Sequence, residues 1–255
     1  MTILKYLFFL ILQFITISLF SQSIGDFRTK KSANWNSPDL WQRFDGTSWV
    51  DVTYFPSDTN GAITISNSTS VVLNIDINAD ELIINGTLTV DNDVIINIID
   101  GAGDDIIVND TLINYGKINV FGSIVNSGLI TNYSFLYFDS ASIYKHNFTT
   151  TPGNIPLSQW HKNSTCEIIG YTSNTITPTG LNQYFGNFIW NCINQNSDIN
   201  LKGNLKNIYG NFSVLSTGSG KLILTNNNSL ILNIYGNFNI SDGKVDFSNG
   251  NYGSL

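Results

Sequence analysis

The sequence predicts an all-β fold, a right-handed parallel β-helix in which short strands stack in successive coils. A phrase recurs in the second half, as FGNF at 185–188 and as YGNF at 209–212 and 235–238, with glycines 24 and 26 residues apart. A period of this length is typical of solenoid proteins. Short β-rich runs also alternate with glycine corners, and helical periodicity is absent. A pair of antiparallel β-sandwiches is the alternative that this pattern leaves open.

Residues 1–22 have the pattern of a secretory signal peptide. Lys5 precedes an apolar run from Tyr6 to Leu12, then Gln13 and a second, largely apolar run from Phe14 to Phe20, and small residues follow from Ser21. The run is short for the ~20 residues that a bilayer requires, and no later segment is long and apolar enough to span one. We therefore expect export with cleavage near Ser21, and no membrane span after the signal is removed; an uncleaved anchor is the alternative.

Residues 23–60 are expected to form an N-terminal cap. Trp35, Trp41 and Trp49 lie in this irregular stretch, and large aromatic rings are suited to covering the open end of a first coil. A second interpretation assigns Trp41 and Trp49 to a platform on which sugar rings stack.

Residues 61–144 are expected to form regular coils. In the run 73–77, apolar side chains alternate with Asn74 and Asp76, which is the pattern of a strand with one buried face. Pairs such as Asn85-Gly86 supply the corners. The many asparagines predict ladders in which side-chain amides bond from one coil to the next.

The regular alternation of strands and corners is interrupted over 145–181. We interpret this stretch, which contains Pro152, Pro156 and Pro178, as an excursion or junction. Coils resume over 182–255. The sequence stops at Leu255 directly after the second strand of a coil, which predicts an exposed strand edge and a fragment of a longer protein.

Composition limits the partners. The net charge is −7 and only 12 lysines and arginines are present, scattered along the chain, so a nucleic-acid partner is not expected.

Cys166 and Cys192 lie 26 residues apart, close to one coil period. Stacking of their coils would bring them to disulfide distance in an oxidising compartment, and two buried free thiols are the alternative.

Two stretches resemble known secreted proteins. The pattern from Trp35 through 63–65 and 82–90 resembles the start of large secreted bacterial β-solenoid proteins, often exported by the type IX system, and the extracellular module named for its eight glycines. The stretch from Trp160 to Cys192 looks like a segment recurring in the same proteins. The resemblance implies a secreted or outer cell-surface location and carries over no catalytic residue.

Chemical motifs are sparse. The stretch 101–110 resembles one unit of a calcium-binding repeat, with Asp104 and Asp105 as candidate ligands. The next nine residues do not repeat the unit, so an ordinary turn is the favoured interpretation. A polysaccharide lyase or hydrolase would need paired carboxylates or a base beside a cation. The candidates near the irregular segment fit no such template: Asp139, Lys145, His146, His161, Lys162 and Glu167.

The sequence therefore predicts a non-enzymatic structural or adhesive β-solenoid segment, without a cofactor unless calcium is bound. Its partners would be extracellular glycans or surface proteins. The alternative is a carbohydrate-active enzyme or a carbohydrate-binding module built on a β-helix and assisted by calcium.

Overall fold

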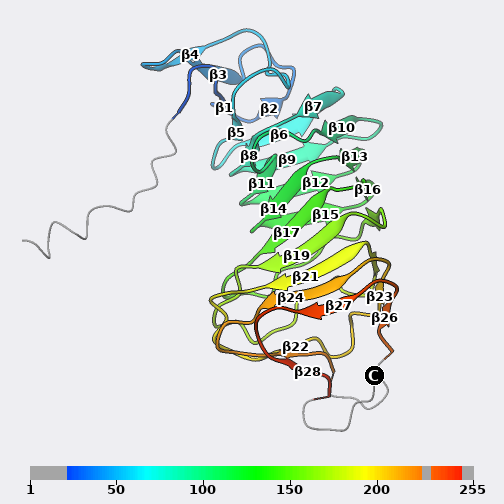
Figure 1. Cartoon of the computed structure of the whole chain (residues 1–255). Helices are drawn as coiled ribbons and strands as arrows, with labels where there is room; N and C mark the ends of the chain where they lie inside the picture. Colours follow the sequence, from blue (N-terminus) through cyan, green and yellow to red (C-terminus); the bar gives the residue numbers. More distant parts are fainter. Residues whose placement is uncertain (1–21, 226–230, 249–255) are drawn as a thin grey trace, which may run out of the picture.

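The computed structural model describes residues 22–225 and 231–248, which form a parallel β-solenoid of about eight turns without a helix (Figure 1). The predicted signal peptide, apart from Gln22, and the last residues, 249–255, lie outside the described ranges. Within those ranges, no helix has the length and apolar character needed to cross a membrane.

Each coil has three sides. Sheet 1 contains twelve strands and forms one side along the whole stack. Its strands, in spatial order, are β27 (Phe238–Ile240), β24 (Phe212–Ser216), β21 (Asn187–Asn191), β19 (Thr165–Ile169), β17 (Ile143–Asn147), β14 (Ser123–Asn126), β11 (Ile106–Val108), β8 (Leu82–Ile84), β5 (Ile63–Ile65), β1 (Phe27–Thr29), β3 (Trp41–Phe44) and β4 (Trp49–Asp51).

In the first half, the chain passes from sheet 1 to sheet 2 and then to sheet 3. Sheet 2 consists of β15 (Leu129–Asn132), β12 (Thr111–Asn114), β9 (Thr87–Val90), β6 (Ser70–Leu73) and β2 (Ala33–Asn34). Sheet 3 consists of β18 (Gln159–Trp160), β16 (Phe135–Phe138), β13 (Lys117–Val120), β10 (Ile95–Ile98) and β7 (Ile77–Ala79).

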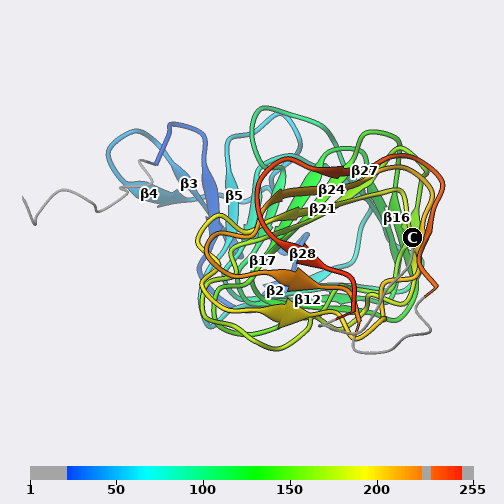
Figure 2. The ribbon, with the colours of Figure 1, turned by 60° about the horizontal axis from the view of Figure 1, so that its bottom comes forward.

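Two shorter sheets take over in the second half. Sheet 4, which follows sheet 1 along the chain, consists of β22 (Ile199–Asn200), β25 (Leu222–Ile223) and β28 (Val245–Asp246). Sheet 5 consists of β20 (Tyr184–Phe185), β23 (Asn207–Ile208) and β26 (Asn233–Ile234), and β20 contacts β18 of sheet 3. Figure 2, in which the C-terminal end comes forward, shows how the coils enclose a common interior.

Parallel pairing confirms the β-solenoid and excludes the sandwiches. Antiparallel pairs occur only at β1–β3 and β3–β4 among the described strands. Equivalent residues of sheet 1 stack coil on coil, for example Tyr144 with Cys166 and Cys166 with Phe188. Coil length is not fixed at the period of the repeat, because 18 residues separate the paired Ile106 and Ile124 and 26 separate Phe212 and Phe238.

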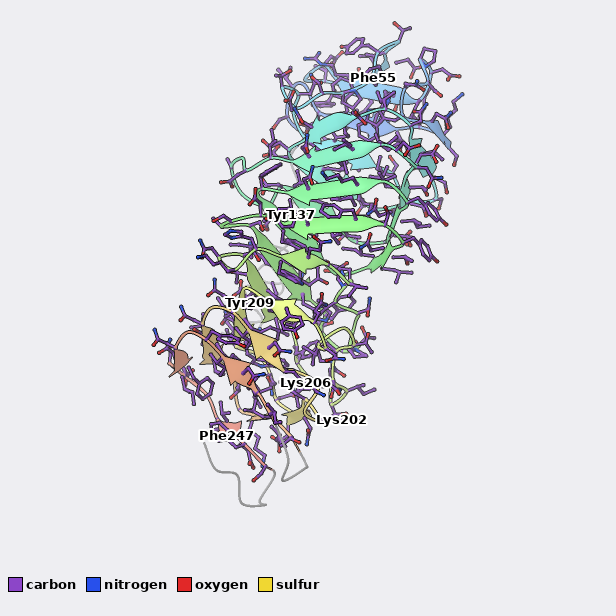
Figure 3. The ribbon with its side chains drawn as sticks, turned by 90° about the vertical axis from the view of Figure 1, so that its right-hand side faces the viewer. Phe55, Tyr137, Lys202, Lys206, Tyr209 and Phe247 are labelled. Atoms are coloured by element: carbon purple, nitrogen blue, oxygen red, sulfur yellow. The ribbon has the colours of Figure 1, made fainter. Side chains whose placement is uncertain are left out.

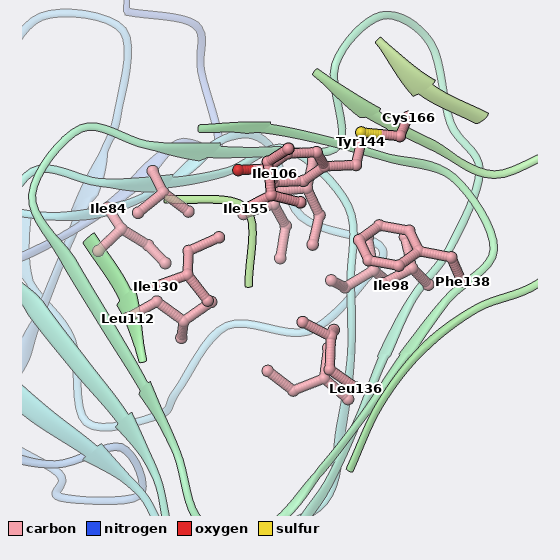
Figure 4. Packing of buried hydrophobic residues seen from close by; sticks show 14 of the residues in the cluster. Ile84, Ile98, Ile106, Leu112, Ile130, Leu136, Phe138, Tyr144, Ile155 and Cys166 are labelled. Atoms are coloured by element: carbon pink, nitrogen blue, oxygen red, sulfur yellow. The ribbon is translucent and has the colours of Figure 1, made fainter. Parts of the chain in front are cut away.

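The core lies where alternate side chains of all three sides meet. Buried residues converge from sheet 1 (Ile84, Ile106), sheet 2 (Leu112, Ile130) and sheet 3 (Ile98, Leu136, Phe138) (Figure 4). Burying each such side chain contributes about 1.5–3 kcal/mol. Because a single coil leaves both of its open sides exposed, these contributions are realised only in the stack.

Residues 22–60 lie at the N-terminal end of the stack. Phe27, Trp35 and Trp41 are fully buried there. The ring of Trp41 packs edge-on against that of Trp35 with centroids 4.8 Å apart, and its Nε1 donates to the carbonyl oxygen of Trp35 at 2.8 Å. These aromatic residues therefore extend the apolar interior beyond β5.

The repeated phrase stacks as expected, with one correction. The rings of Tyr209 and Tyr235 lie 5.8 Å apart and nearly parallel. Phe185 is not their equivalent, because it pairs in register with Ile208 and is fully buried. Tyr184 instead stacks on Tyr209, with centroids 5.6 Å apart. The glycines still align, since the N–H of Gly210 bonds to the carbonyl of Gly186, so Tyr209 is an extra residue between the two aligned positions.

The predicted amide ladders are present. On sheet 3, Nδ2 of Asn119 donates to Oδ1 of Asn97 at 2.8 Å, and Asn97 donates to Asn78 at 3.0 Å. These bonds follow the coil stacking direction, as amide ladders do in cross-β structures. They therefore fix the register of neighbouring coils at the surface.

Candidate functional site: a groove over the irregular coils

The main hollow that we describe is an open groove of about 720 Å³ on the side of sheets 2 and 4. It lies beside β15, the last strand of sheet 2, and extends to the turn that follows β22. Two irregular segments, which we call the floor segments, line it between these strands: 154–157 and 176–183.

The groove exists because two successive coils lack a strand on this side. Between β17 and β18, and again between β19 and β20, the chain forms no ladder, and an isolated bridge between Asn154 and Thr179 joins the floor segments. Pro156 and Pro178 lie in these segments and have no backbone N–H to donate to a ladder. The irregular region predicted at 145–181 is thus the origin of the groove.

A buried polar cluster supports the first floor segment from inside. Nε2 of His146 lies 2.8 Å from the carbonyl oxygen of Pro152, and the hydroxyl of Tyr171 donates to the same oxygen at 2.5 Å. The hydroxyl of Tyr144 lies 3.2 Å from Nδ1 of His146 and 3.3 Å from the carbonyl oxygen of Asn154. These side chains hold backbone carbonyls that have no strand partner.

Burial sets the protonation of this cluster. It lowers the pKa of His146 to about 4, against a smaller opposing effect of the bond to Pro152. The imidazole is therefore neutral at neutral pH. Because a carbonyl only accepts, Nε2 carries the proton and Nδ1 is left as an acceptor, so the single proton of the Tyr144 hydroxyl is shared between Nδ1 and the carbonyl oxygen of Asn154. Burial also raises the pKa of Tyr144 and Tyr171 well above the usual value.

Gln183 supports the second floor segment. Its Oε1 accepts from the indole Nε1 of Trp160 at 2.9 Å and from the N–H of Ser158 at 3.1 Å, and its Nε2 donates to the carbonyl of Gly180 at 2.6 Å. Its Nε2 also donates to the carbonyl of Pro156 at 3.3 Å, so this buried amide links both floor segments to the last strand of sheet 3.

The lining is mainly aliphatic and amide-bearing, with a single charge. Leu129, Leu157 and Ile176 are 52%, 72% and 57% exposed, which is high for aliphatic residues grouped in one hollow. Amides and one cation, Lys202, accompany them, and the described lining contains no carboxylate and no histidine. The arrangement offers apolar contact and hydrogen bonds, but it holds no acid and base pair.

The six candidate acid/base residues lie outside this lining. Lys145 and Glu167 pair in register on sheet 1, and Lys145 bonds to Asp104 at 2.5 Å. His146 is buried below the groove floor. Asp139 follows β16, while His161 and Lys162 follow the neighbouring β18. Among the described residues, no side-chain hydrogen bond joins any two of the six.

The two candidate calcium ligands point to different partners. Successive residues of an extended chain alternate in direction. Asp105 is buried, and its carboxylate accepts from the N–H groups of Gly101 at 2.8 Å and Ser123 at 2.6 Å. Asp104 forms the ion pair with Lys145. In the described ranges, no group of three or more metal-ligating side chains occurs.

The predicted sugar platform of Trp41 and Trp49 is not formed. Trp41 is fully buried, so its ring faces are closed to any ligand. Trp49 is partly exposed, but the guanidinium of Arg28 lies over its ring at 4.4 Å from the centroid. The two residues belong to the packing of the N-terminal end.

Cys166 and Cys192 are free and buried. Cys166 pairs in register with Phe188, so Cys192 lies four residues farther along the next coil. At ~3.3 Å per residue that offset is about 13 Å, well beyond disulfide distance. The predicted disulfide is therefore not formed, because a spacing close to one period does not place two residues at the same position of a coil.

Exposed tyrosine columns were not predicted as sites. Tyr115 and Tyr133 stack at the corner between sheets 2 and 3, with centroids 5.0 Å apart and ring planes at 9°. Tyr184, Tyr209 and Tyr235 form a second column on sheet 5, where Figure 3 labels Tyr209. The tyrosine of the YGNF phrase was the available signal for the second column.

Comparison with known proteins gives no relative. No protein-family model, curated protein or solved structure matches this chain. Functional inference therefore rests on the groove, the tyrosine columns and the sequence patterns.

Proposed function

We propose that this chain is a non-enzymatic, adhesive β-solenoid segment of a secreted or cell-surface protein, and that the groove is its adhesive site. The signal-like residues 1–22 support export. The stacked coils supply a rigid support on which a surface site can be displayed.

The lining of the groove carries this proposal. Its exposed aliphatic residues favour contact with a partner, since such residues rarely gather on a surface that contacts only water. Hydrolysis or elimination on a polysaccharide needs acid and base groups in contact with the substrate. The described lining lacks such groups.

Binding and turnover test the proposal together. Purified chain without residues 1–22 should bind an immobilised panel of extracellular polysaccharides and surface proteins, measured by biolayer interferometry. Leu157→Asp in the groove should weaken this binding, and the matched Ile193→Asp, at a position 67% exposed outside the groove, should not. Saturable release of sugar fragments from any polysaccharide would contradict the proposal.

A carbohydrate-binding module is the second candidate, and the tyrosine columns favour it. Tyr133 and Tyr235 are 66% and 70% exposed, and each lies at an end of its column, where one ring face is not covered by a stacked tyrosine. Sugar rings stack on such faces. Binding on a glycan array that is lost in Tyr133→Ala or Tyr235→Ala, but retained in Leu157→Asp, would favour this function over the groove.

A further inference from the structure

We infer that the groove binds an extended polypeptide segment that carries aliphatic side chains followed by an acidic group. This inference names the partner of the adhesive site and rests on the proposed function. Three features of the groove carry it: the order of its side chains, its hydrogen-bonding groups and its single charge.

The exposed side chains follow one another along the stack. Leu129 belongs to the coil of β15, Leu157 to the next coil and Ile176 to the one after, and Lys202 follows β22 in the fourth coil. Three steps of ~4.8 Å between stacked strands give a length of about 14 Å. An extended peptide covers that length with about four residues, at ~3.4 Å each.

Hydrogen-bonding groups suited to a peptide backbone border this path. β15 has a strand neighbour on one side only among the described strands. The amides of Leu129 and Tyr133 bond back to the coil of β12, so the N–H and C=O groups of the alternate residues Ile130 and Asn132 point away from it. The side chains of Asn182 and Asn204 are exposed in the lining. A peptide that runs along the stack crosses this edge, so these groups and the two amides can bond to individual backbone groups of the peptide.

The aliphatic lining distinguishes a peptide from a sugar. No aromatic residue lines the groove in the described part of the chain, whereas sugars are held largely by stacking on aromatic rings. Leucine and isoleucine side chains instead fit aliphatic side chains of a partner, through dispersion and removal of apolar area from water.

The positive charge of Lys202, at the end of the groove farthest from β15, favours an acidic group in the partner. Lys202 forms no ion pair with the described residues, in contrast to Lys30, Lys31, Lys145 and Lys221. Figure 3 shows Lys202 near Lys206, which is exposed but outside the lining. A chain of net charge −7 repels acidic partners in general. An unpaired cation at this end therefore gives the groove a local preference for an acid.

Fluorescence anisotropy with a defined probe tests the inference on the purified chain. The probe is a labelled, C-terminally amidated octapeptide that alternates leucine and threonine and ends in glutamate. Two comparison peptides replace the glutamate by lysine or N-methylate alternate backbone nitrogens. Cellohexaose serves as the glycan probe.

We expect the glutamate peptide to bind more tightly than both comparison peptides. Leu157→Asp should raise its Kd about tenfold or more, as for a central contact of an interface. Lys202→Glu should reverse the preference between the glutamate and lysine peptides. Ile193→Asp, which makes the same change outside the lining, should leave every Kd unchanged, and Lys206→Glu should not reverse the preference between the two peptides. The melting temperature of each variant confirms folding.

Equal binding of the glutamate and lysine peptides, or a Kd that the groove variants do not change, would overturn the inference. Binding of cellohexaose alone, lost in Leu157→Asp, would overturn the peptide partner and leave the adhesive function standing. Failure of all probes, together with no binding to the immobilised surface panel, would overturn both.

Discussion

His146 donates a hydrogen bond from Nε2 to the carbonyl oxygen of Pro152 at 2.8 Å, from a position that is fully buried. Pro152 lies in the stretch between β17 and β18 in which the coil has no strand on its second side. The interior histidine thus takes the place of a ladder partner, and the shape of the groove depends on its neutral form.

Acidification is therefore expected to destabilise the chain. Burial lowers the folded-state pKa of His146 to about 4, whereas a histidine in the unfolded chain has a pKa of about 6.5. Between these values the unfolded state binds more protons, so the free energy of unfolding falls as pH decreases, by about 3 kcal/mol at pH ~4. Urea denaturation at pH ~7 and pH ~4.5 measures the difference.

The matched variants identify the residue responsible. His146→Gln should lower stability at pH ~7 by about 2 kcal/mol, because it alters a buried network, and should lose much of the dependence between pH 7 and 4.5. His161→Gln should keep that dependence. If His146→Gln retains the full pH dependence, this histidine is not its source.

The contribution of Asp80 to stability depends on pH with the opposite sign. Burial, and then the nearby charge of Asp105, raise the pKa of Asp80. An acid with a raised folded-state pKa contributes its full stability below the unfolded-state pKa and loses it as pH rises through the folded value. We expect Asp80→Asn to raise the melting temperature by about 1–2 °C at pH ~7 and to have less effect at pH ~3.5.

Asp93→Asn is the control for this change. Asp93 is exposed and has a φ of 63°, a region that asparagine tolerates well. The Asp93→Asn substitution removes one negative charge from the same acidic chain but leaves Asp80 and Asp105 unchanged. Equal stabilisation by both variants would assign the effect to net charge and contradict the proposed repulsion.

The stacked glycine phrase predicts a coupling between neighbouring coils. Oδ1 of Asn187 accepts from the N–H of Asn211 at 2.9 Å. A Cβ on Gly210 would lie 2.3 Å from that same Oδ1. Gly210→Ala should therefore cost about 2 kcal/mol, and Asn187→Ala about 1–2 kcal/mol through the unpaired N–H.

The double variant tests whether one contact explains both costs. Removing the Asn187 side chain also removes the clash, so the double variant should lose about 1 kcal/mol less than the sum of the two single changes. Gly103→Ala, where a Cβ meets no atom within 4 Å, should add to Asn187→Ala without coupling. Strict additivity for Gly210→Ala would contradict the stacked arrangement. Urea denaturation measures each cost.

The parallel stack was predictable from sequence because a repeated strand with its corner pairs with its own copy. The sequence did not show which aromatic residue of the phrase points outward. Gly186 and Gly210 align, yet Phe185 pairs with Ile208, and the extra residue Tyr209 faces solvent. An insertion of one residue at a corner is not visible in a phrase that looks continuous.

From the sequence, the groove was predictable only as an interruption of the regular strand pattern. Pro156 and Pro178 indicate where ladders fail. The positions of its floor segments depend on bonds such as that between Gln183 and Trp160, which are 23 residues apart. Likewise, Trp41 and Trp49 look alike in sequence, and only the antiparallel pairing of β3 places Trp41 in the interior.

The cysteines provide a test of register that is independent of ligand binding. Burial raises the pKa of Cys166 well above that of an ordinary thiol and raises the pKa of Cys192 to about 12. Both thiols should therefore be unreactive toward Ellman's reagent in the native chain, and both should react once the chain is unfolded in guanidinium without reductant. Intact mass should be the same with and without reductant after export to an oxidising compartment. A mass lower by two hydrogens, with no thiol titrated after unfolding, would require Cys192 to lie opposite Cys166, and the pairing of Cys166 with Phe188 would then be wrong.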